Sequence, residues 1–352
     1  MNPPKSQGMV EIRWLDSIQS EAVFARRAIR RGTRIAAETP LVVVPPVPKE
    51  KELSTFCDEI YQAPDSTAKI AELPIRPLVK ERIKKDHYMN QQVWEFYKAK
   101  RWIDSKGTLL KGKKLHKTIM KTMDLCTIFR TNSVHLGPEG RYGSGLFSLY
   151  GRINHSCVPN THNSYNPTLK RLTIHAIHDI KAGDQICVDY IGDVCRTRQQ
   201  RAFSLYNTWG ITCNCVACTD PQINRLRCRM LLLDQAMKQA LAAYECGAST
   251  QPNFAAIHGV PRVTTAAKAL RTTKELVHIL KAQGLHGTEL CRTLRECSKY
   301  ALDSGSPDAA LQYAREELQL EISLIGKETS HLEADFQGAK YWVKHIRALI
   351  TS

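Results

Sequence analysis

The chain has 352 residues, 43% of them hydrophobic, which excludes a disordered chain and leaves room for two domains or one large domain with an appendage. Its 50 Lys and Arg against 34 Asp and Glu give a net charge of +16, which either serves solubility or favours an acidic or polyanionic partner. No run of about 18 apolar residues occurs, and the N-terminus lacks the apolar centre of a signal peptide, so we expect neither a membrane span nor secretion. The twelve cysteines should then be reduced, in the nucleus or the cytoplasm, as buried or metal-bound thiols.

Residues 1–47 are predicted to form short strands. The segments "VEIRWLDS", "AVFARRAI" and "PLVVVPPV" have strand character, and Arg31-Gly32 marks a turn before the last of them. Pro45 and Pro46 end that strand, because proline has no backbone N–H to donate to a neighbouring strand.

Residues 48–130 change to helical spacing and are rich in lysine. Between Arg76 and Lys121, fourteen Lys or Arg stand against four Asp or Glu. This basic insertion is either a solvated helical face or a docking surface for an acidic partner. Nucleic acid would bind there only nonspecifically, by counterion release, since no base-reading motif accompanies the charge.

Residues 131–195 return to strands. The segments "RLTIHAIHDI" and "KAGDQICVDY" flank a turn at residues 182–184. Before them, "GRINHSCVPN" places amide, imidazole, hydroxyl and thiol groups directly after the apolar run "GLFSLY". A surface loop would not need the apolar lead-in, whereas a buried loop would require a partner for each of these polar groups.

Residues 196–225 contain a cluster of three cysteines with C-x-C-x-x-C spacing. The cluster consists of Cys213, Cys215 and Cys218. Thiolates this close converge on one tetrahedral ion, so the spacing predicts a structural Zn²⁺ site, against the alternative of three unrelated thiols. A closed site needs a fourth ligand, and the spacing leaves Cys157, Cys195, Cys228 or a histidine open.

Residues 226–352 read as a series of amphipathic helices. Gly305, Pro307 and Gly326 fall between the periodic segments as stop and start signals, and Asp303 or Ser306 could cap the helix that follows. The piece "PDAALQYAREEL" is similar to half of a tetratricopeptide unit. We interpret this part as a stack of antiparallel helices that serves as a scaffold or a partner surface.

Three segments, "INHSCVPN", "LTIHAIHDIKAGDQICVDY" and "WGITCNCVAC", resemble in order the signature segments of the SET-domain methyltransferases. The resemblance covers most of residues 10–220 and is closest to the SMYD-type and fungal SET branch, although the zinc-binding MYND module usual there is absent from residues 48–130. It implies an α+β fold, with a β-clip core of short strands, a knot-like loop, a helical insertion, a zinc-bound post-SET segment and a C-terminal helical domain.

The same resemblance assigns roles to single residues. Tyr190 matches the catalytic tyrosine and also borders the cofactor, S-adenosyl-L-methionine. Further cofactor contacts would come from two motifs: Asn132, Ser133, Asn154 and His155. Cys157 would be the fourth zinc ligand. The loop that carries Asn154 and His155 would then contact both the cofactor and the metal.

The chain departs from the family pattern at two places. The family's Gly-x-Gly, which contacts the cofactor, falls on Ser20, Glu21 and Ala22. Where such a backbone position requires a positive φ, a Cβ costs roughly 1–2 kcal/mol. The family usually has two aromatic residues just before the cysteines, which help to wall the lysine channel or the adenine pocket. Trp209 matches the first, but Ile211 replaces the second, so we expect the channel to be reshaped.

The leading hypothesis is a methyltransferase that transfers a methyl group from S-adenosyl-L-methionine to a lysine of a histone or another protein. The alternatives are a catalytically inactive SET scaffold and a SET-like enzyme that acts on a small molecule. We divide the chain into an N-terminal SET part, a basic helical insertion, a C-terminal SET part, a zinc segment and a helical domain. Their boundaries are residues 1–47, 48–130, 131–195, 196–225 and 226–352.

Overall fold

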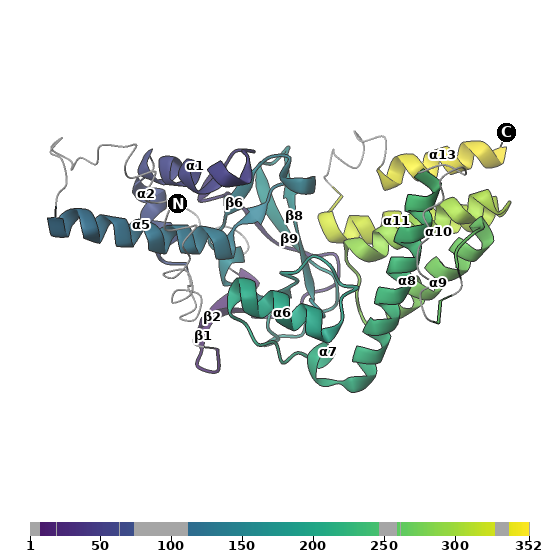
Figure 1. The fold of residues 1–352 in the computed structure, drawn as a ribbon, viewed down its shortest axis with the longest axis horizontal. Coiled ribbons are helices and arrows are strands. Elements are labelled where there is room, and N and C mark those ends of the chain that lie inside the picture. The colour runs from purple at the N-terminus through teal and green to yellow at the C-terminus, as the bar shows by residue number, and fades with distance from the viewer. Residues whose placement is uncertain are drawn as a thin grey trace.

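A computed structural model of the chain describes residues 8–18, 20–62, 64–73, 112–245, 259–260, 262–327 and 338–351 (Figure 1). Short strands, most of them antiparallel, combine with helices, which confirms the predicted α+β class. Most of the basic insertion predicted between Arg76 and Lys121 lies outside the described residues, so its role stays a prediction.

The strands form four small sheets. The first is a hairpin of β1 (Val10–Leu15) and β2 (Ser20–Ala25). In the second, β9 (Arg171–Ala176) lies between β3 (Arg34–Glu38) and β8 (Thr161–Asn166). In the third, β6 (Ser144–Leu146) lies between β4 (Val42–Val44) and β5 (Val134–His135). The fourth is the parallel pair β7 (Asn154–His155) and β10 (Cys187–Val188).

The strand predicted for "AVFARRAI" is shorter than expected. Strand β2 ends at Ala25, and Ile29 is held only by an isolated bridge to Ile180. The arginines at 26, 27, 30 and 31 are exposed, while Ile29 is 3% exposed, so this segment follows the surface as a loop with one apolar anchor. Gly32 closes it with φ at 80°, a left-handed turn that favours glycine.

The described part of the insertion is helical, as predicted. It contains α1 (Lys49–Gln62), α2 (Pro64–Ala71) and the long α5 (Gly112–Asn132). Phe56 of α1 stacks on Phe129 of α5 with ring centroids 4.4 Å apart. Cys57 and Cys126, with sulfurs 3.5 Å apart, are buried in the same apolar core, where they pack as small hydrophobic side chains.

Two helices flank the cysteine cluster. Helix α6 (Arg198–Trp209) begins with a capping box, in which Thr197 and Gln200 each bind the other's backbone N–H, and ends at Gly210 in the left-handed conformation. Helix α7 (Val216–Thr219) is a single turn. The sequence analysis did not predict α6, and its end positions Trp209 next to the cysteines.

The C-terminal part consists of helices that each pack on the next (Figure 1). They are α8 (Pro221–Glu245), α9 (Ala266–Ala282), α10 (Thr288–Asp303), α11 (Pro307–Ile325) and α13 (Ala339–Thr351). Ser306 is the N-cap of α11 but makes no side-chain capping bond. Helix α11 also packs on β8 and β9, and Ile177 and Cys195 belong to the apolar core of the helices. The likeness to tetratricopeptide repeats stays a prediction.

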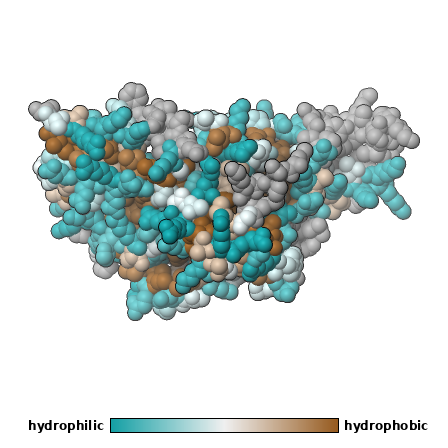
Figure 2. All heavy atoms as spheres, turned by 180° about the vertical axis from the view of Figure 1, so that it is seen from behind, coloured by the Kyte–Doolittle hydropathy of each residue, from teal (hydrophilic) through white to brown (hydrophobic). Residues whose placement is uncertain are grey.

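The face of the molecule opposite to that in Figure 1 is predominantly polar among the described residues. Seen from behind, the molecule presents mostly hydrophilic residues, with brown apolar patches between them (Figure 2). Within the described ranges, every helix is too short or too polar to cross a lipid bilayer.

Glu317 on α11 should make the stability of the protein depend on pH. Burial raises its pKa to about 7 from the usual 4.5, although an ion pair with Arg295 at 2.7 Å opposes this shift. The folded protein therefore holds a proton that the unfolded chain releases, a contribution fully present below pH 4.5 and lost as the pH rises through 7. Across this window we expect the free energy of unfolding of the wild type to fall by about 2–3 kcal/mol more than that of Glu317→Gln.

Urea unfolding of both proteins at pH 5 and pH 8 measures this difference. The Gln variant cannot ionise, so it also controls for all other groups that titrate between these pH values. Equal pH dependence of the two proteins would show that Glu317 is not protonated in the folded state.

Candidate functional site

The polar loop of residues 151–160 is buried or half-buried, and its polar groups find partners. Asn154, which is 8% exposed, donates from Nδ2 to the carbonyl of Glu21 at 3.2 Å. Asn160 donates to the carbonyl of Gln185 at 2.8 Å and accepts from the backbone N–H of Cys187 at 2.9 Å. These bonds replace the water that the amides would lose on burial, so the loop is fixed against β2 and β10.

His155 connects this loop to the end of β10. Its Nδ1 accepts from the backbone N–H of Tyr190 at 3.1 Å, so the ring proton must be on Nε2. Nε2 lies 3.2 Å from the sulfur of Cys157 and therefore donates to it. One imidazole thus joins the backbone of Tyr190 to a thiol of the cysteine group.

Tyr190 lies between two other rings. Its ring centroid is 5.5 Å from that of His155 and 5.3 Å from that of Trp209, both tilted. Its hydroxyl donates to the carbonyl of Ile153. Trp209 is held in turn by a bond from Nε1 to the carbonyl of Thr131 at 2.9 Å. The phenol is therefore fixed at both its backbone and its hydroxyl.

A cavity of about 390 Å³ lies in front of this tyrosine. Its walls come from the end of α5, from the strand segments of residues 150–194, from α6 and from the loop between α9 and α10. Of the residues that the sequence analysis assigned to the cofactor, three line the cavity: Asn132, Ser133 and Tyr190. The other five are not in its wall: Ser20, Glu21, Ala22, Asn154 and His155. Of these five, His155 accepts from the backbone N–H of Tyr190 in the wall, and its neighbour Asn154 donates to the carbonyl of Glu21.

The backbone at Ser20, Glu21 and Ala22 is unstrained. The three residues lie in β2, and among the described non-glycine residues only Glu139 and Lys170 have a positive φ. The steric penalty considered for a Cβ at these positions therefore does not arise. The Glu21 carboxylate binds the Arg152 guanidinium at 2.6 Å.

The fold brings into the cavity wall two residues to which the sequence analysis assigned no role, Tyr150 and His162. Burial raises the pKa of Tyr150 and lowers the pKa of His162 to about 4, so the phenol and the imidazole are both neutral at pH 7. No local pattern marks either residue, because only the long-range pairing of strands places them here. Ile211, expected to reshape the channel, is instead buried beneath the cysteine cluster.

The loop between α9 and α10 supplies a wall that the sequence did not indicate. His286 and Glu289 line the cavity from this side. Burial, and then the neighbouring His178, lowers the pKa of His286 to about 4. Glu289 forms an ion pair with Arg292 at 2.5 Å. The wall therefore adds a neutral imidazole and a neutralised carboxylate.

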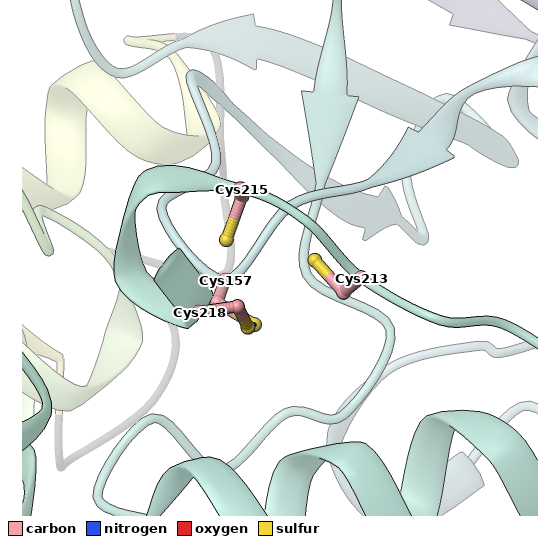
Figure 3. Close-up of side chains that lie close together, drawn as sticks. All are labelled: Cys157, Cys213, Cys215 and Cys218. Carbon is pink, nitrogen blue, oxygen red and sulfur yellow. The ribbon is translucent and has the colours of Figure 1, made fainter. Parts of the chain in front are cut away.

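The four predicted zinc ligands lie together (Figure 3). Cys157 comes from the loop after β7, and it joins the three others, Cys213, Cys215 and Cys218. The four sulfurs are all within 4.8 Å of one another, and those of Cys157 and Cys218 are 3.6 Å apart. A tetrahedral site with Zn–S bonds of about 2.3 Å requires sulfurs about 3.8 Å apart, so this donor set fits the ion.

Two buried arginines next to the cysteines provide an independent test of the fit. Arg201 and Arg227 are 1% and 0% exposed. The Nη2 of Arg201 lies 3.8 Å from the sulfur of Cys218, and its buried Nε has no partner among the described groups. Arg227 donates to the carbonyl of Cys157 at 2.8 Å. Four thiolates around one divalent ion carry two negative charges, which two guanidinium groups balance. Arg227 is also near the carboxylate of Asp189. Four neutral thiols would leave Arg201 with no anionic group in contact among the described residues.

A second group of potential ligands, Cys195, Asp234 and Glu289, also lies within 4.8 Å. Its carboxylates already bind cations of the chain, because Asp234 contacts Arg292 at 3.0 Å and Lys238 at 2.6 Å. We therefore interpret it as an ion-pair network, and Cys195 is not the missing ligand of the first group.

The SET-domain family profile matches residues 21–191. Histone-lysine N-methyltransferase set5 of Schizosaccharomyces pombe is 39% identical over 75 residues, 21% of this chain and 23% of that protein. Protein-lysine N-trimethyltransferase SMYD5 of Homo sapiens is 40% identical over 79 residues, 22% of this chain and 19% of that protein. The chain thus matches less than a quarter of the length of these relatives.

One solved structure aligns along most of the chain. It is the SET domain of LSMT bound to lysine and AdoHcy, and the alignment covers 97% of this chain and 86% of that one. The sequence identity is 13% and the TM-score 0.37, a likeness too loose to locate a ligand.

Replacing one cysteine of the group should abolish metal binding. We expect about one zinc per chain in the purified protein and none in Cys157→Ser, since three thiolates do not close a tetrahedral site. The exposed Cys228 on α8 provides a matched control, and Cys228→Ser should keep its zinc. Metal analysis by mass spectrometry measures both, and a full zinc content in Cys157→Ser would exclude this residue as a ligand.

Arg201→Met should weaken the metal site without removing a ligand. Because a buried cation next to the thiolates stabilises their charge, we expect the affinity for zinc to fall by roughly 10–100-fold. Competition with a chromogenic chelator measures the affinity, and circular dichroism checks the fold. Arg198→Met, at an exposed position of the same helix, should leave the affinity unchanged; equal affinities of all three proteins would contradict the charge balance.

Proposed function

Residues 21–191 of this chain belong to the SET-domain family, and on that premise we propose that the protein is an S-adenosylmethionine-dependent methyltransferase acting on a lysine of a protein. The observation that carries the proposal is the cavity of about 390 Å³ whose wall includes Tyr190, Asn132 and Ser133. The relatives named as lysine methyltransferases support a protein substrate, and the name of the Schizosaccharomyces pombe protein makes a histone the first to test.

The residues around the cavity suit a ligand of the size of this cofactor. Pockets of roughly 300–1,000 Å³ hold such molecules, and the end of α5 offers an amide and a hydroxyl at Asn132 and Ser133. We assign the amino-acid part of the cofactor to these two side chains. We also propose that the backbone of Asn154 and His155, which are not in the cavity wall, contacts its nucleoside. When bound, the cofactor supplies a methyl group on a positively charged sulfur.

The walls of the cavity favour the neutral form of the acceptor amine. A free lysine has a pKa of about 10.4, so only about one amine in two thousand has a lone pair at pH 7. Neutral imidazoles at His162 and His286 and the neutral phenol of Tyr150 give this lining little charge. The Asp189 carboxylate accepts from the backbone N–H groups of Ile191 and Gly192 and lies near the Arg227 cation, which offsets its charge. A desolvating wall without an uncompensated anion favours loss of the amine's proton.

Tyr190 would orient the reacting groups. Because its hydroxyl donates to the carbonyl of Ile153, its oxygen lone pairs remain available to the carbon-bound hydrogens of a methyl group in the cavity. Alignment of the acceptor nitrogen with this methyl group then contributes much of the rate. The proposal requires no acid–base triad.

The structure weakens the argument for an inactive scaffold. That alternative rested on the lost Gly-x-Gly, but Ser20, Glu21 and Ala22 lie in an ordinary extended strand. We therefore retain these three residues as part of the proposed cofactor site. We also propose the structural Zn²⁺ at the four cysteines, the division of the chain into the five parts defined above, and a location in the nucleus or the cytoplasm.

Tyr190→Phe should separate binding from catalysis. The hydroxyl acts on the reacting methyl group, so we expect methyl transfer to fall by roughly a hundredfold or more while the affinity for the cofactor changes little. Transfer of labelled methyl groups to core histones, with calorimetry of S-adenosylmethionine on zinc-loaded protein, measures both. Tyr341→Phe on α13, remote from the cavity wall, is the control.

Two results would overturn the proposal. Absence of binding at millimolar cofactor would exclude the transferase, and unchanged transfer by Tyr190→Phe would exclude the tyrosine. Labelling of a small metabolite in place of any protein would instead select the small-molecule alternative.

A further inference from the structure

The segment from the end of β2 to the first residue of β3 carries a dense group of arginines that the proposed catalytic site does not use. Within nine positions it holds five, all of them exposed: Arg26, Arg27, Arg30, Arg31 and Arg34. We call these five residues the arginine row. It lies within the SET domain and is separate in sequence from the basic insertion predicted between Arg76 and Lys121.

The backbone of the arginine row is fixed. Ile29 and Ile180 exchange two backbone hydrogen bonds of 2.8 Å, and Gly32 donates to the carbonyl of Ala176 at 2.7 Å. Because Ile29 is the residue that turns inward, the guanidinium groups on either side of it are directed to the solvent. The fold therefore presents these charges on a rigid surface rather than on a loose tail.

The acidic groups beside the row are engaged. Glu11 contacts Arg13 as well as Arg26, the latter at 3.9 Å, and Asp179 accepts from the backbone N–H of Arg31 at 2.8 Å. Asp184, whose carbonyl accepts from the backbone N–H of Ala25, accepts with its carboxylate from the backbone N–H of Lys181 at 3.0 Å. Lys181, exposed on the facing segment, adds another cation. Among the described residues, Arg27, Arg30 and Arg31 form no ion pair, so this surface has a local excess of positive charge.

We propose that the arginine row is a docking surface for the phosphate backbone of a nucleic acid. All five cations in it are arginines, whose planar guanidinium groups can bind a phosphate through two parallel hydrogen bonds. Lysine would serve equally well if the charge only kept the protein soluble. No base-reading element accompanies the row, so binding depends on phosphate contacts and counterion release rather than on sequence.

The row lies close to the proposed active site. Gly32 donates to the carbonyl of Ala176, and the next residue along the chain, Ile177, lines the cavity. Arg31 is also near enough to His286 in the cavity wall for its charge to act on that ring. A nucleic acid on the row would therefore lie beside the wall of the cavity, where it could hold a protein that is itself bound to the same strand.

The test compares two variants with the same change in charge. Arg27→Glu/Arg30→Glu/Arg31→Glu alters the row, and Lys268→Glu/Arg271→Glu/Lys274→Glu alters exposed positions of α9. Fluorescence anisotropy with a 20-base-pair DNA and a single-stranded RNA of equal length measures binding over a range of salt concentrations. We expect the row variant to bind at least about tenfold more weakly, with a salt slope smaller by about 2–3, and the α9 variant to bind like the wild type.

Each outcome decides one point. Preference for DNA or for RNA identifies the source of the phosphates, and either supports the proposal. An equal loss of nucleic-acid affinity in both variants would show that net charge alone is responsible and would overturn the proposal. Competition by polyglutamate as strong as that by DNA would indicate an acidic protein as the partner and would overturn it as well. Thermal unfolding and cofactor binding of the row variant show whether the fold is intact, and these readouts keep the outcome independent of the proposed methyl transfer.

Discussion

The bridge formed by His155 is the interaction on which the candidate site depends. Its ring accepts from the backbone of Tyr190 on one side and donates to the sulfur of Cys157 on the other. The tyrosine that faces the cavity and the thiol that completes the cysteine group are therefore held by one side chain. A change in the cysteine group would therefore reach the cavity wall through this ring.

The bridge is possible because β7 and β10 pair in parallel, which brings residues 154–155 beside residues 187–188. Asn154 and Asn160 then secure the two ends of the polar loop to β2 and β10. Buried amides are costly unless each is satisfied, and these bonds satisfy them. The loop can thus place polar groups next to a cavity without destabilising the fold around it.

Local patterns in the sequence were sufficient to separate the strand regions from the helical regions and to find the three clustered cysteines, although they missed helix α6. The partner of these cysteines could not be found by spacing: Cys157 was identified only by resemblance, and the fold then placed its sulfur beside the others. Arg201, His162 and the loop around His286 gave no signal. Their positions depend on packing between segments far apart in the chain, which no local pattern encodes.

The core shared between the SET region and the C-terminal helices sets a limit on how this protein can be divided. Ile177 and Cys195 are buried among residues of α8 to α11, and α11 covers β8 and β9. Cutting the chain after residue 191 would expose that apolar surface to water and remove the wall that contains His286. The unit that folds therefore extends beyond the segment that matches the family and includes the helices that follow it.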